Sequence, residues 1–457
     1  MSDTGFSVDG RRVVVVGAAR SGVAAAELLV RKGGRVTLSE TRDGFDDSAR
    51  LREMGIALEL GGHKPSTLAG ADLIVVSPGV DVVQDVFNAA RNRGVEMIGE
   101  LELAWRWLKG RVIAVTGTKG KSTTTTLIGR MLRSGGRQVM VGGNIGVPLS
   151  TQVDTSTPET IHVVETSSFQ LETTTTFRPW IAVWLNFADD HLDRHPSVEA
   201  YAAAKARIFA NQTDEDWAVV NADDRVVMER STRTAARRVV FSPSGHVASG
   251  FVVESDWIVR RTTTTTDRLI PIEAVELAGR HMLNNVLAAS AVTWLAGVPP
   301  AAMVGALRGF RGLEHVMEPA GEIGRVRFVN DSKATNVEAA LRSIESFRAN
   351  VVAIIGGRYK GGDFGELREA LAAHGRGVVA IGEAAPRVRE ALGGVVPIVD
   401  ASSLREAVER AYEMAHPDGV VLLAPACSSF DWFRDYAERG RTFKEEVNAL
   451  RERTTSE

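Results

Sequence analysis

The stretch RVIAVTGTKGKSTTTTLIGRML, residues 111–132, decides the fold of the middle of this chain. The apolar run VIAV leads into a glycine-rich turn and then into a helical pattern, so the order is strand, loop, helix. Glycines let the backbone N–H groups of such a loop face an anion, and the helix N-terminus adds a favourable dipole. Lys121 and Ser122 at the helix start suit phosphate and Mg²⁺. The pattern predicts a phosphate-binding loop, shortened because Val115 stands where the usual first glycine would be.

The same alternation of apolar strand, glycine-containing turn and helix recurs on both sides of this stretch. The residues RRVVVVGAARSG (11–22) open the first region, and VVAIIGG (351–357) lies in the third. Strands of this kind alternating with helices imply parallel sheets covered by helices throughout. We predict an α/β chain of three domains: a Rossmann-like N-terminal domain, a central P-loop-type ATPase domain with a mostly parallel sheet, and a Rossmann-like C-terminal domain. The predicted limits are 1–107, 108–312 and 313–457.

Bulk composition narrows the class of protein. The 457 residues are too many for one hydrophobic core, since domains usually hold roughly 100–200 residues. A net charge of −3 gives no reason to expect nucleic acid or a membrane surface as the main partner. The single cysteine, Cys427, excludes an internal disulfide and suits a reducing compartment. No apolar run approaches the ~20 residues that span a bilayer, and no signal peptide precedes the first strand, so we expect a cytoplasmic protein. We also expect a monomer.

The turn GAARSG (17–22) is a degenerate dinucleotide-type motif, with Ala19 where the middle glycine would be. Glu40 ends the next predicted strand about twenty residues later, where such folds place an acid that binds ribose. Taken alone, the pair favours a nicotinamide cofactor. A plain strand–turn–helix connection that binds nothing is the alternative.

Two polar side chains of the middle region, Glu165 and His191, follow predicted strands. The carboxyl ends of parallel strands meet at one edge of a sheet, so both side chains should face the crevice of the phosphate loop and complete Mg²⁺ coordination there. Lys205, in YAAAKARIF, reads by default as a solvated helix lysine.

Three polar loops follow strands of the third region. NDSKATN (330–336) carries a dense polar cluster, and GGRYKGGDF (356–364) and PACSSF (425–430) occupy equivalent positions. One such loop is compatible with a simple turn, but three in one domain indicate a ligand crevice.

Seven motifs occur in the order that is typical of the Mur ligase family, and the resemblance runs from the first strand to RTFKEEV (441–447). They are TGTKGKST (116–123), GGNIG (142–146), ETSSFQLE (165–172), DHLDRH (190–195), YAAAKARI (201–208), NDSKATN (330–336) and PACSSFDWF (425–433). The last two together resemble the members of the family that add D-glutamate.

The resemblance implies an ATP-dependent peptide ligase of peptidoglycan precursor synthesis. It would add D-glutamate to UDP-N-acetylmuramoyl-L-alanine through an acyl phosphate, with ATP and two Mg²⁺ ions. The motifs leave open a folylpolyglutamate synthetase or another muropeptide ligase. A nucleotide-binding regulator that has lost catalysis and, third, a dehydrogenase are the alternatives from other classes.

The resemblance also assigns roles residue by residue. The catalytic residues would be Lys121, His191 and Lys205, and the metal ligands Ser122, Glu165, His191 and Lys205, with Lys205 carbamylated. ATP would contact Gly117, Thr118, Lys119, Gly120, Lys121, Ser122, Thr123, Asn285 and Asp331. The UDP-linked substrate would contact Ser21, Glu40, Thr41, Ser77, Gly79 and Asn144. D-Glutamate would contact Lys333, Thr335, Lys360, Ser429, Phe430 and Tyr436.

One position departs from the family pattern. Where the family has arginine in G-L-x-H-R-x-E, this chain reads GLEHVME, with Val316 in that place. The arginine is expected to contact ATP, so its loss should weaken ATP binding while leaving the chemistry intact, unless Arg308 or Arg311 substitutes. Val316→Arg should therefore lower the KM for ATP in a steady-state assay, and an unchanged KM would contradict this explanation.

Overall fold

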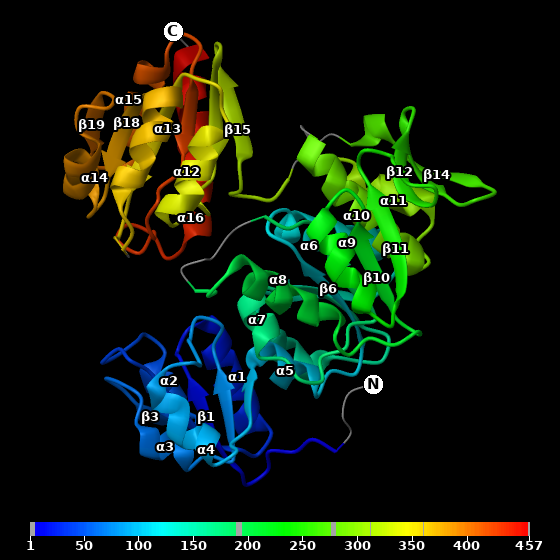
Figure 1. Cartoon of the computed structure of the whole chain (residues 1–457). Helices are drawn as coiled ribbons and strands as arrows, with labels where there is room; N and C mark the ends of the chain where they lie inside the picture. Colours follow the sequence, from blue (N-terminus) through cyan, green and yellow to red (C-terminus); the bar gives the residue numbers. More distant parts are fainter. Residues whose placement is uncertain (1–4, 189–193, 276–279, 311, 360, 456–457) are drawn as a thin grey trace. The chain divides into compact units, whose positions relative to one another are not determined.

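The computed structural model describes residues 5–188, 194–275, 280–310, 312–359 and 361–455. The chain divides into two compact units, Met1–Phe310 and Arg311–Glu457. Each of the three regions recognised in the sequence contains a β-sheet with helices, which confirms the α/β class (Figure 1).

The first sheet has five parallel strands in the order β3-β2-β1-β4-β5. Its strands are β1 (Arg12–Val16), β2 (Arg35–Ser39), β3 (Ala57–Glu59), β4 (Leu73–Val76) and β5 (Met97–Gly99). Its helices are α1 (Arg20–Arg31), α2 (Ser48–Glu53), α3 (Pro65–Ala69), α4 (Asn88–Asn92) and α5 (Glu100–Trp105). The strand order reverses at β1, between β2 and β4, and such a reversal is where open parallel sheets place their ligand crevice.

The second sheet of the same unit has nine strands in the order β14-β13-β12-β11-β10-β9-β6-β8-β7. Its strands are β6 (Arg111–Thr116), β7 (Val139–Gly143), β8 (Ile161–Glu165), β9 (Ile181–Trp184), β10 (Trp217–Asn221), β11 (Arg237–Ser242), β12 (Gly250–Glu254), β13 (Trp257–Arg261) and β14 (Thr266–Pro271). Its α-helices are α6 (Lys121–Ser134), α7 (Ser168–Glu172), α8 (Val198–Ala206), α9 (Arg225–Arg230), α10 (Arg280–Leu295) and α11 (Pro300–Leu307).

Strand β6 of the second sheet is buried on both faces. Ile113 and Val115 of β6 pack in one apolar cluster with helices α6, α10 and α11. Val112 and Ala114, which point the other way, belong to a cluster that also contains the core of the first sheet. This shared core explains why the two sheets form one compact unit.

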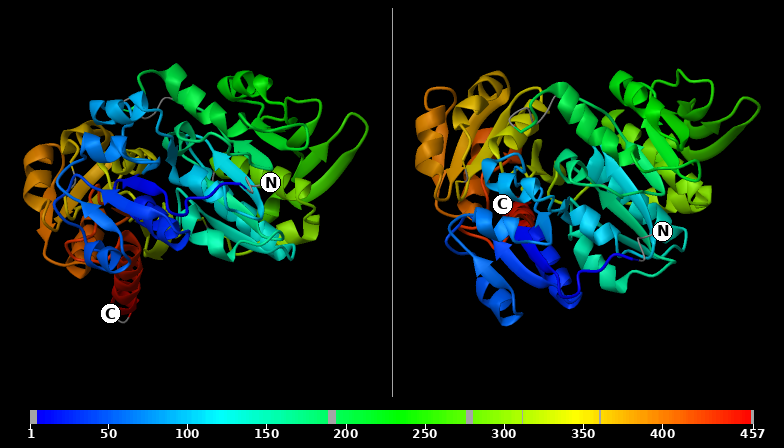
Figure 2. Two further views of the ribbon diagram at one scale, coloured as in Figure 1. Left: turned by 90° about the horizontal axis from the view of Figure 1, so that it is seen from below. Right: turned by 60° about the horizontal axis from the view of Figure 1, so that its bottom comes forward.

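Three antiparallel hairpins correct the expectation that the sheets are parallel throughout. β13 pairs antiparallel with both β12 and β14, and β15 (Glu318–Ile323) pairs antiparallel with β16 (Val326–Asn330). The turn between β12 and β13 has two residues, and a connection this short can join only antiparallel neighbours. The β13–β14 hairpin projects from the edge of its sheet (Figures 1 and 2), and the threonine run at 262–265 forms its turn.

The second unit has one six-stranded sheet in the order β15-β16-β20-β17-β18-β19, parallel apart from β15. Its remaining strands are β17 (Val351–Gly356), β18 (Gly375–Ile381), β19 (Ile398–Ala401) and β20 (Val420–Leu423). Helices α12 (Val337–Glu345), α13 (Arg368–His374) and α14 (Ala385–Leu392) share one apolar cluster with the sheet. Helices α15 (Leu404–Ala415) and α16 (Tyr436–Thr455) share the other.

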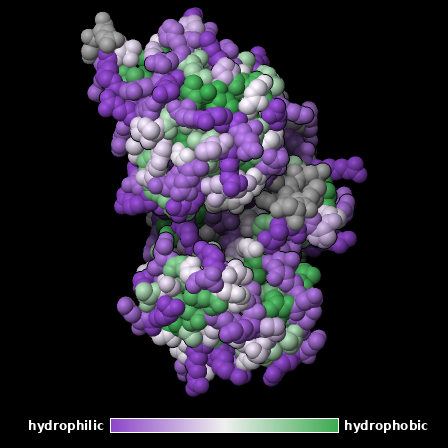
Figure 3. Space-filling view, turned by 90° about the vertical axis from the view of Figure 1, so that its left-hand side faces the viewer, coloured by the Kyte–Doolittle hydropathy of each residue, from purple (hydrophilic) through white to green (hydrophobic). Residues whose placement is uncertain are grey.

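In the part of the chain that the structure describes, no helix is both long enough and apolar enough to cross a bilayer. The face shown in Figure 3 carries mostly hydrophilic side chains, with hydrophobic ones in small groups.

Candidate active site

The predicted phosphate loop lies between β6 and α6, at the carboxyl edge of the nine-stranded sheet. Gly120, the residue before α6, has a φ of +81°, and a Cβ there would lie 2.3 Å from Asn285 Oδ1. Only glycine combines that backbone with so close a neighbour. The first N–H groups of α6 have no partner inside the helix, so they are available to an anion.

Asn186, which the sequence reasoning missed, fixes the shape of this loop. Its Oδ1 accepts hydrogen bonds from the backbone N–H groups of Thr118 (3.1 Å) and Lys119 (2.8 Å). Its Nδ2 donates to the carbonyl oxygen of Lys119 at 3.0 Å. Asn186 follows β9, the strand beside β6, and a polar residue at that neighbouring strand end was the available signal.

Asn186→Ala should raise the KM for ATP about tenfold, because the loop loses three hydrogen bonds that fix its backbone before nucleotide binds. Steady-state kinetics with ATP varied tests this. Asn186→Asp keeps the acceptor oxygen and is the matched comparison. A KM for ATP that is unchanged in the alanine variant would contradict the role.

Three predicted site residues meet around the carboxylate of Glu165, at the end of β8. Glu165 Oε2 accepts a 2.6 Å hydrogen bond from Ser122 Oγ, and Oε1 accepts one of 2.7 Å from Asn144 Nδ2. Glu165 is only 2% exposed. Carboxylate and hydroxyl oxygens beside a phosphate loop are the donors that Mg²⁺ uses together with phosphate oxygens.

His191, the other predicted metal ligand, lies outside the described residues. Within the described residues, no group of three or more His, Cys, Asp or Glu side chains is placed to hold a metal ion. Glu165 and Ser122 nevertheless fit Mg²⁺, which commonly takes one or two protein carboxylates and completes its shell with water and phosphate.

Two lysines converge on the carbonyl oxygen of Gly117. Lys121 Nζ donates to it at 3.0 Å and to the carbonyl of Thr118 at 2.9 Å, and Lys205 Nζ donates to Gly117 O at 2.9 Å. Lys205 is 2% exposed and its Nζ lies 4.5 Å from the centre of the Tyr201 ring. The default expectation of a solvated Lys205 is therefore wrong, and the helix α8 places this side chain at the phosphate loop.

Asn285, predicted to contact adenine, lies on α10 beside the same loop. Its Oδ1 accepts a 3.3 Å hydrogen bond from Thr124 Oγ1, and its side chain is the neighbour that requires glycine at position 120. The structure thus brings Asn285 together with Lys121, Ser122 and Glu165 at one edge of the sheet.

A cavity of about 420 Å³ lies at the carboxyl edge of the first sheet. Its lining residues include Gly17, Glu40, Thr41, His63, Gly79 and Arg194. Three of the residues predicted for the UDP-linked substrate therefore line one pocket, at the point where the strand order reverses. Ser77 lies beside it, donating from Oγ to the carbonyl of Gly17 at 3.0 Å, and Ser21 lies in the first turn of α1.

Glu40 is an anion in this pocket. Burial would raise the pKa of its carboxyl, but hydrogen bonds from Arg42, from the Ala18 N–H and from Thr41 outweigh burial and lower that pKa to about 2. The Ala18 bond is 2.7 Å long and orients Oε2 toward the glycine turn. A fixed carboxylate here suits the hydroxyl or N–H donors of a nucleoside.

Arg194 reaches this pocket from the DHLDRH segment, and the sequence reasoning missed it. Its Nη1 donates to the carbonyl of Gly79 at 3.0 Å, and its guanidinium lies 5.0 Å from the centre of the Phe169 ring. Phe169 stacks on His195 in turn, at 5.1 Å and 6°. Arg194 therefore adds a positive charge to the rim of a cavity that Glu40 makes acidic inside.

In the second unit, the three polar loops predicted to form a crevice lie side by side. The Ala426 N–H donates to the carbonyl of Ala334 at 2.9 Å, and the Arg358 N–H donates to that of Ser428 at 3.0 Å. Arg439 of α16, 1% exposed, donates to Ser332 Oγ and to the Cys427 carbonyl at 3.0 and 3.1 Å. These bonds hold the strand ends of β16, β17 and β20 together.

The predicted D-glutamate residues are distributed over these loops. Lys333 and Thr335 lie in the first loop, Ser429 is 2% exposed, Phe430 is 59% exposed, and Tyr436 begins α16. Lys360 lies outside the described residues. Asp331 is buried, which raises the pKa of its carboxyl, and it accepts hydrogen bonds from Ser343 Oγ and the Met317 N–H.

Val316, where the family has arginine, is half-buried between two residues of positive φ, His315 (64°) and Met317 (44°). Of the two arginines that were considered as substitutes, Arg308 is exposed at the end of α11 and Arg311 lies outside the described residues.

Three domain models of one family match the chain in order. The Mur ligase MurD-like N-terminal domain matches residues 11–99, and the Mur ligase middle domain matches residues 115–293. The Mur ligase glutamate ligase domain matches residues 317–427.

Curated relatives cover nearly the whole chain. A UDP-N-acetylmuramoylalanine–D-glutamate ligase of Acidobacterium capsulatum is 46% identical over 98% of this chain and 98% of its own length. A ligase of the same name from Desulfosudis oleivorans is 43% identical over 97% of each chain.

Solved structures share the fold at lower identity. A UDP-N-acetylmuramate-alanine ligase from Thermotoga maritima has a TM-score of 0.55 and 20% identity, covering 96% of this chain and 100% of that one. A MurF ligase from Thermotoga maritima, in complex with ADP, has a TM-score of 0.53 and 18% identity, covering 97% and 96%.

Proposed function

The chain belongs to the Mur ligase family, and on that premise we propose that it joins D-glutamate to UDP-N-acetylmuramoyl-L-alanine while ATP is converted to ADP and phosphate. The observation that carries the proposal is 46% identity to a ligase of that name over 98% of both chains. The arrangement of Lys121, Ser122 and Glu165 around one phosphate loop supports it independently.

The reaction must activate a carboxylate, because forming an amide from a free carboxylate is uphill in water. The γ-phosphoryl group of ATP passes to an oxygen of the L-alanyl carboxylate, giving an acyl phosphate and ADP. The amine of D-glutamate then attacks the carbonyl carbon, and the tetrahedral intermediate collapses to the amide as phosphate leaves. The N–H groups at the start of α6 and the ammonium of Lys121 stabilise the charge on the transferring phosphoryl group.

Ser122, Glu165, His191 and Lys205 would hold Mg²⁺, two ions in our proposal. The metal would supply charge neutralisation at the phosphates when bound. We propose that Lys205 carries a carbamate, because this buried side chain lies at the phosphate loop and a carbamate would offer anionic oxygens to the metal.

The remaining assignments complete the proposal. The pocket around Glu40 would take the UDP part of the substrate, and the loops of the second unit would take D-glutamate through Lys333, Thr335, Lys360, Ser429, Phe430 and Tyr436. We also propose three domains with the limits 1–107, 108–312 and 313–457, a cytoplasmic location and a monomeric state.

A coupled phosphate-release assay tests the activity. Phosphate release should require UDP-N-acetylmuramoyl-L-alanine and D-glutamate together and should fail with L-glutamate, and varying bicarbonate tests the carbamate. Release with a folate acceptor or with another muropeptide would instead assign one of the sister ligases. ATP binding without any product would assign a nucleotide-binding regulator.

Arg194→Gln should raise the KM for UDP-N-acetylmuramoyl-L-alanine about tenfold while leaving the KM for ATP unchanged, because a charge-assisted hydrogen bond to the substrate is lost. Steady-state kinetics with each substrate varied measures the two constants. Arg52→Gln, at an exposed position of α2, is the matched control. Equal shifts in both KM values would assign Arg194 a structural role instead.

A further inference from the structure

A second cavity, of about 490 Å³, opens at the edge of the nine-stranded sheet opposite the phosphate loop. It lies where β6, β9, β10 and β11 begin, whereas the phosphate loop lies where β6 ends. Its volume falls in the range of small-molecule sites, about 300–1,000 Å³. None of the residues assigned above to ATP, the UDP-linked substrate or D-glutamate lines it.

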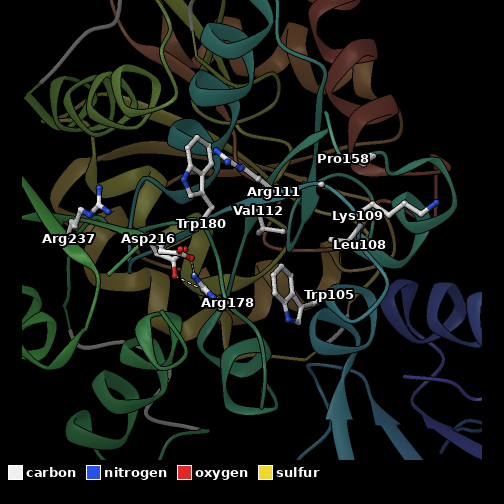
Figure 4. A pocket seen from close by; sticks show the side chains of 12 residues that line it. Trp105, Leu108, Lys109, Arg111, Val112, Pro158, Arg178, Trp180, Asp216 and Arg237 are labelled. Carbon is white, nitrogen blue, oxygen red and sulfur yellow. Dashed lines mark hydrogen bonds and ion pairs between the residues drawn. The ribbon is translucent and has the colours of Figure 1, made fainter. Parts of the chain in front are cut away.

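The lining combines aromatic and cationic side chains, as Figure 4 shows. Trp105, Leu108, Val112 and Trp180 form the apolar part, and Lys109, Arg111, Arg178 and Arg237 the basic part. Glu215 and Asp216 are the acidic residues of the lining, so four basic against two acidic side chains leave a net charge of +2.

Both acidic side chains of the lining form ion pairs with Arg178. Arg178 Nε lies 2.6 Å from Asp216 and its Nη2 3.2 Å from Glu215. Lys109, Arg111 and Arg237 are exposed, and no described acidic side chain forms an ion pair with any of them. Arg237 Nε donates to the carbonyl of Asp214 at 2.6 Å, and its guanidinium lies 5.1 Å from the centre of the Trp217 ring. The net charge of +2 around one cavity favours an anionic ligand.

An aromatic surface accompanies these charges. The guanidinium of Arg111 lies 4.6 Å from the centre of the Trp180 ring. Such a cation–π pair offers a planar ring a place to stack, which is how Trp and Arg bind bases in proteins that recognise nucleotides.

Hydrogen bonds and ring packing hold two parts of the cavity wall in place. Trp105 Nε1 donates to the carbonyl of Thr176 at 3.0 Å, and the ring meets Phe177 edge-on at 5.7 Å. The N–H groups of Lys109 and Gly110 both donate to Ser156 Oγ, at 3.1 and 3.2 Å. A preformed wall lowers the entropy that a ligand loses on binding.

We propose that this cavity is a second ligand site, which binds a mononucleotide with its base on the Trp180–Arg111 pair and its phosphate toward Arg237. Leu108, Lys109 and Gly110 of the lining belong to the segment 106–110, which joins α5 to β6 and thus connects the first sheet to the second. A bound ligand would therefore contact the segment that links the substrate pocket of Glu40 to the nucleotide loop.

Calorimetric titration of the full chain with guanosine monophosphate tests the proposal. A non-hydrolysable ATP analogue and UDP-N-acetylmuramoyl-L-alanine are kept at saturation so that the other nucleotide sites are filled. We expect one further site per chain, and binding at least about tenfold weaker in Arg111→Glu, since both stacking and charge are lost. Hydrogen exchange of residues 105–112 should slow on addition of the same nucleotide.

Arg233→Glu changes the charge equally at an exposed arginine that does not line the cavity, and it should bind like the wild type. Arg237→Glu, with a matching melting temperature, provides a second lining variant should Arg111→Glu be unstable. No binding by the wild-type chain would overturn the proposal. Equal weakening by Arg233→Glu would do the same, because the effect would then be one of net charge.

Discussion

Glu102→Ala is expected to lower the free energy of unfolding by about 3–5 kcal/mol, the usual cost of removing one partner from a buried ionic network. Glu102 is fully buried and accepts hydrogen bonds of 3.0 Å from the N–H groups of Thr175, Thr176 and Phe177. Arg106 Nε donates to it at 3.0 Å. Its loss would leave the Phe177 N–H and the Arg106 guanidinium without this acceptor in the core that the two sheets share.

Urea unfolding followed by tryptophan fluorescence measures this loss. Glu53→Ala, at an exposed position of α2, is the matched control and should change stability by no more than about 0.5 kcal/mol. A Glu102→Ala midpoint equal to that of the control would show that the network contributes nothing.

The same carboxylate predicts a pH dependence. Burial would raise the pKa of Glu102, but hydrogen bonds from Thr176, Thr175 and Arg106 outweigh it and leave the pKa lowered. The pKa of Glu102 is lower in the folded than in the unfolded state. Its contribution to the free energy of unfolding is therefore complete at pH values above the unfolded-state pKa of about 4.3. It is lost as the pH falls through the folded value. The stability gap between wild type and Glu102→Ala should therefore shrink on acidification below about pH 4.

Features set by local sequence could be predicted well. The phosphate loop needs a strand, glycines, a lysine and a serine within one short stretch, and the structure places all of them as that stretch implies. The antiparallel hairpins were missed because β12 and β13 are short apolar runs that resemble parallel core strands, and a two-residue turn without glycine gives a weak signal.

The contacts of Asn186 and Arg194, which join distant parts of the chain, could not be predicted. Asn186 holds a loop 67 or 68 positions earlier in the chain, and Arg194 meets Gly79 across 115 positions. No spacing rule reports contacts of that kind. Lys205 shows the same limit, because a lysine in an alanine-rich helix reads as solvated until the fold buries it against Tyr201 and Gly117.

Lys121→Ala is expected to lower kcat by about 10³-fold, the size of effect seen when one charge is removed from a transferring phosphoryl group. In the structure its ammonium is held over the phosphate loop by the carbonyls of Gly117 and Thr118, at 3.0 and 2.9 Å. The side chain is therefore already positioned at the helix N-terminus where phosphates bind.

Three measurements separate chemistry from folding in this variant. The melting temperature should stay close to that of the wild type, because Lys121 lies at a loop–helix junction outside the apolar clusters. The affinity for ADP, measured by calorimetry, should fall by a much smaller factor than kcat. Lys121 is expected to stabilise the phosphoryl group in the transition state more strongly than it stabilises bound ADP. Lys121→Arg keeps the charge but changes its reach and geometry, so it should recover only part of the rate. A Lys121→Ala enzyme with normal kcat and a raised KM for ATP alone would mean that this lysine binds the nucleotide equally in the ground and transition states, and its catalytic role would then be wrong.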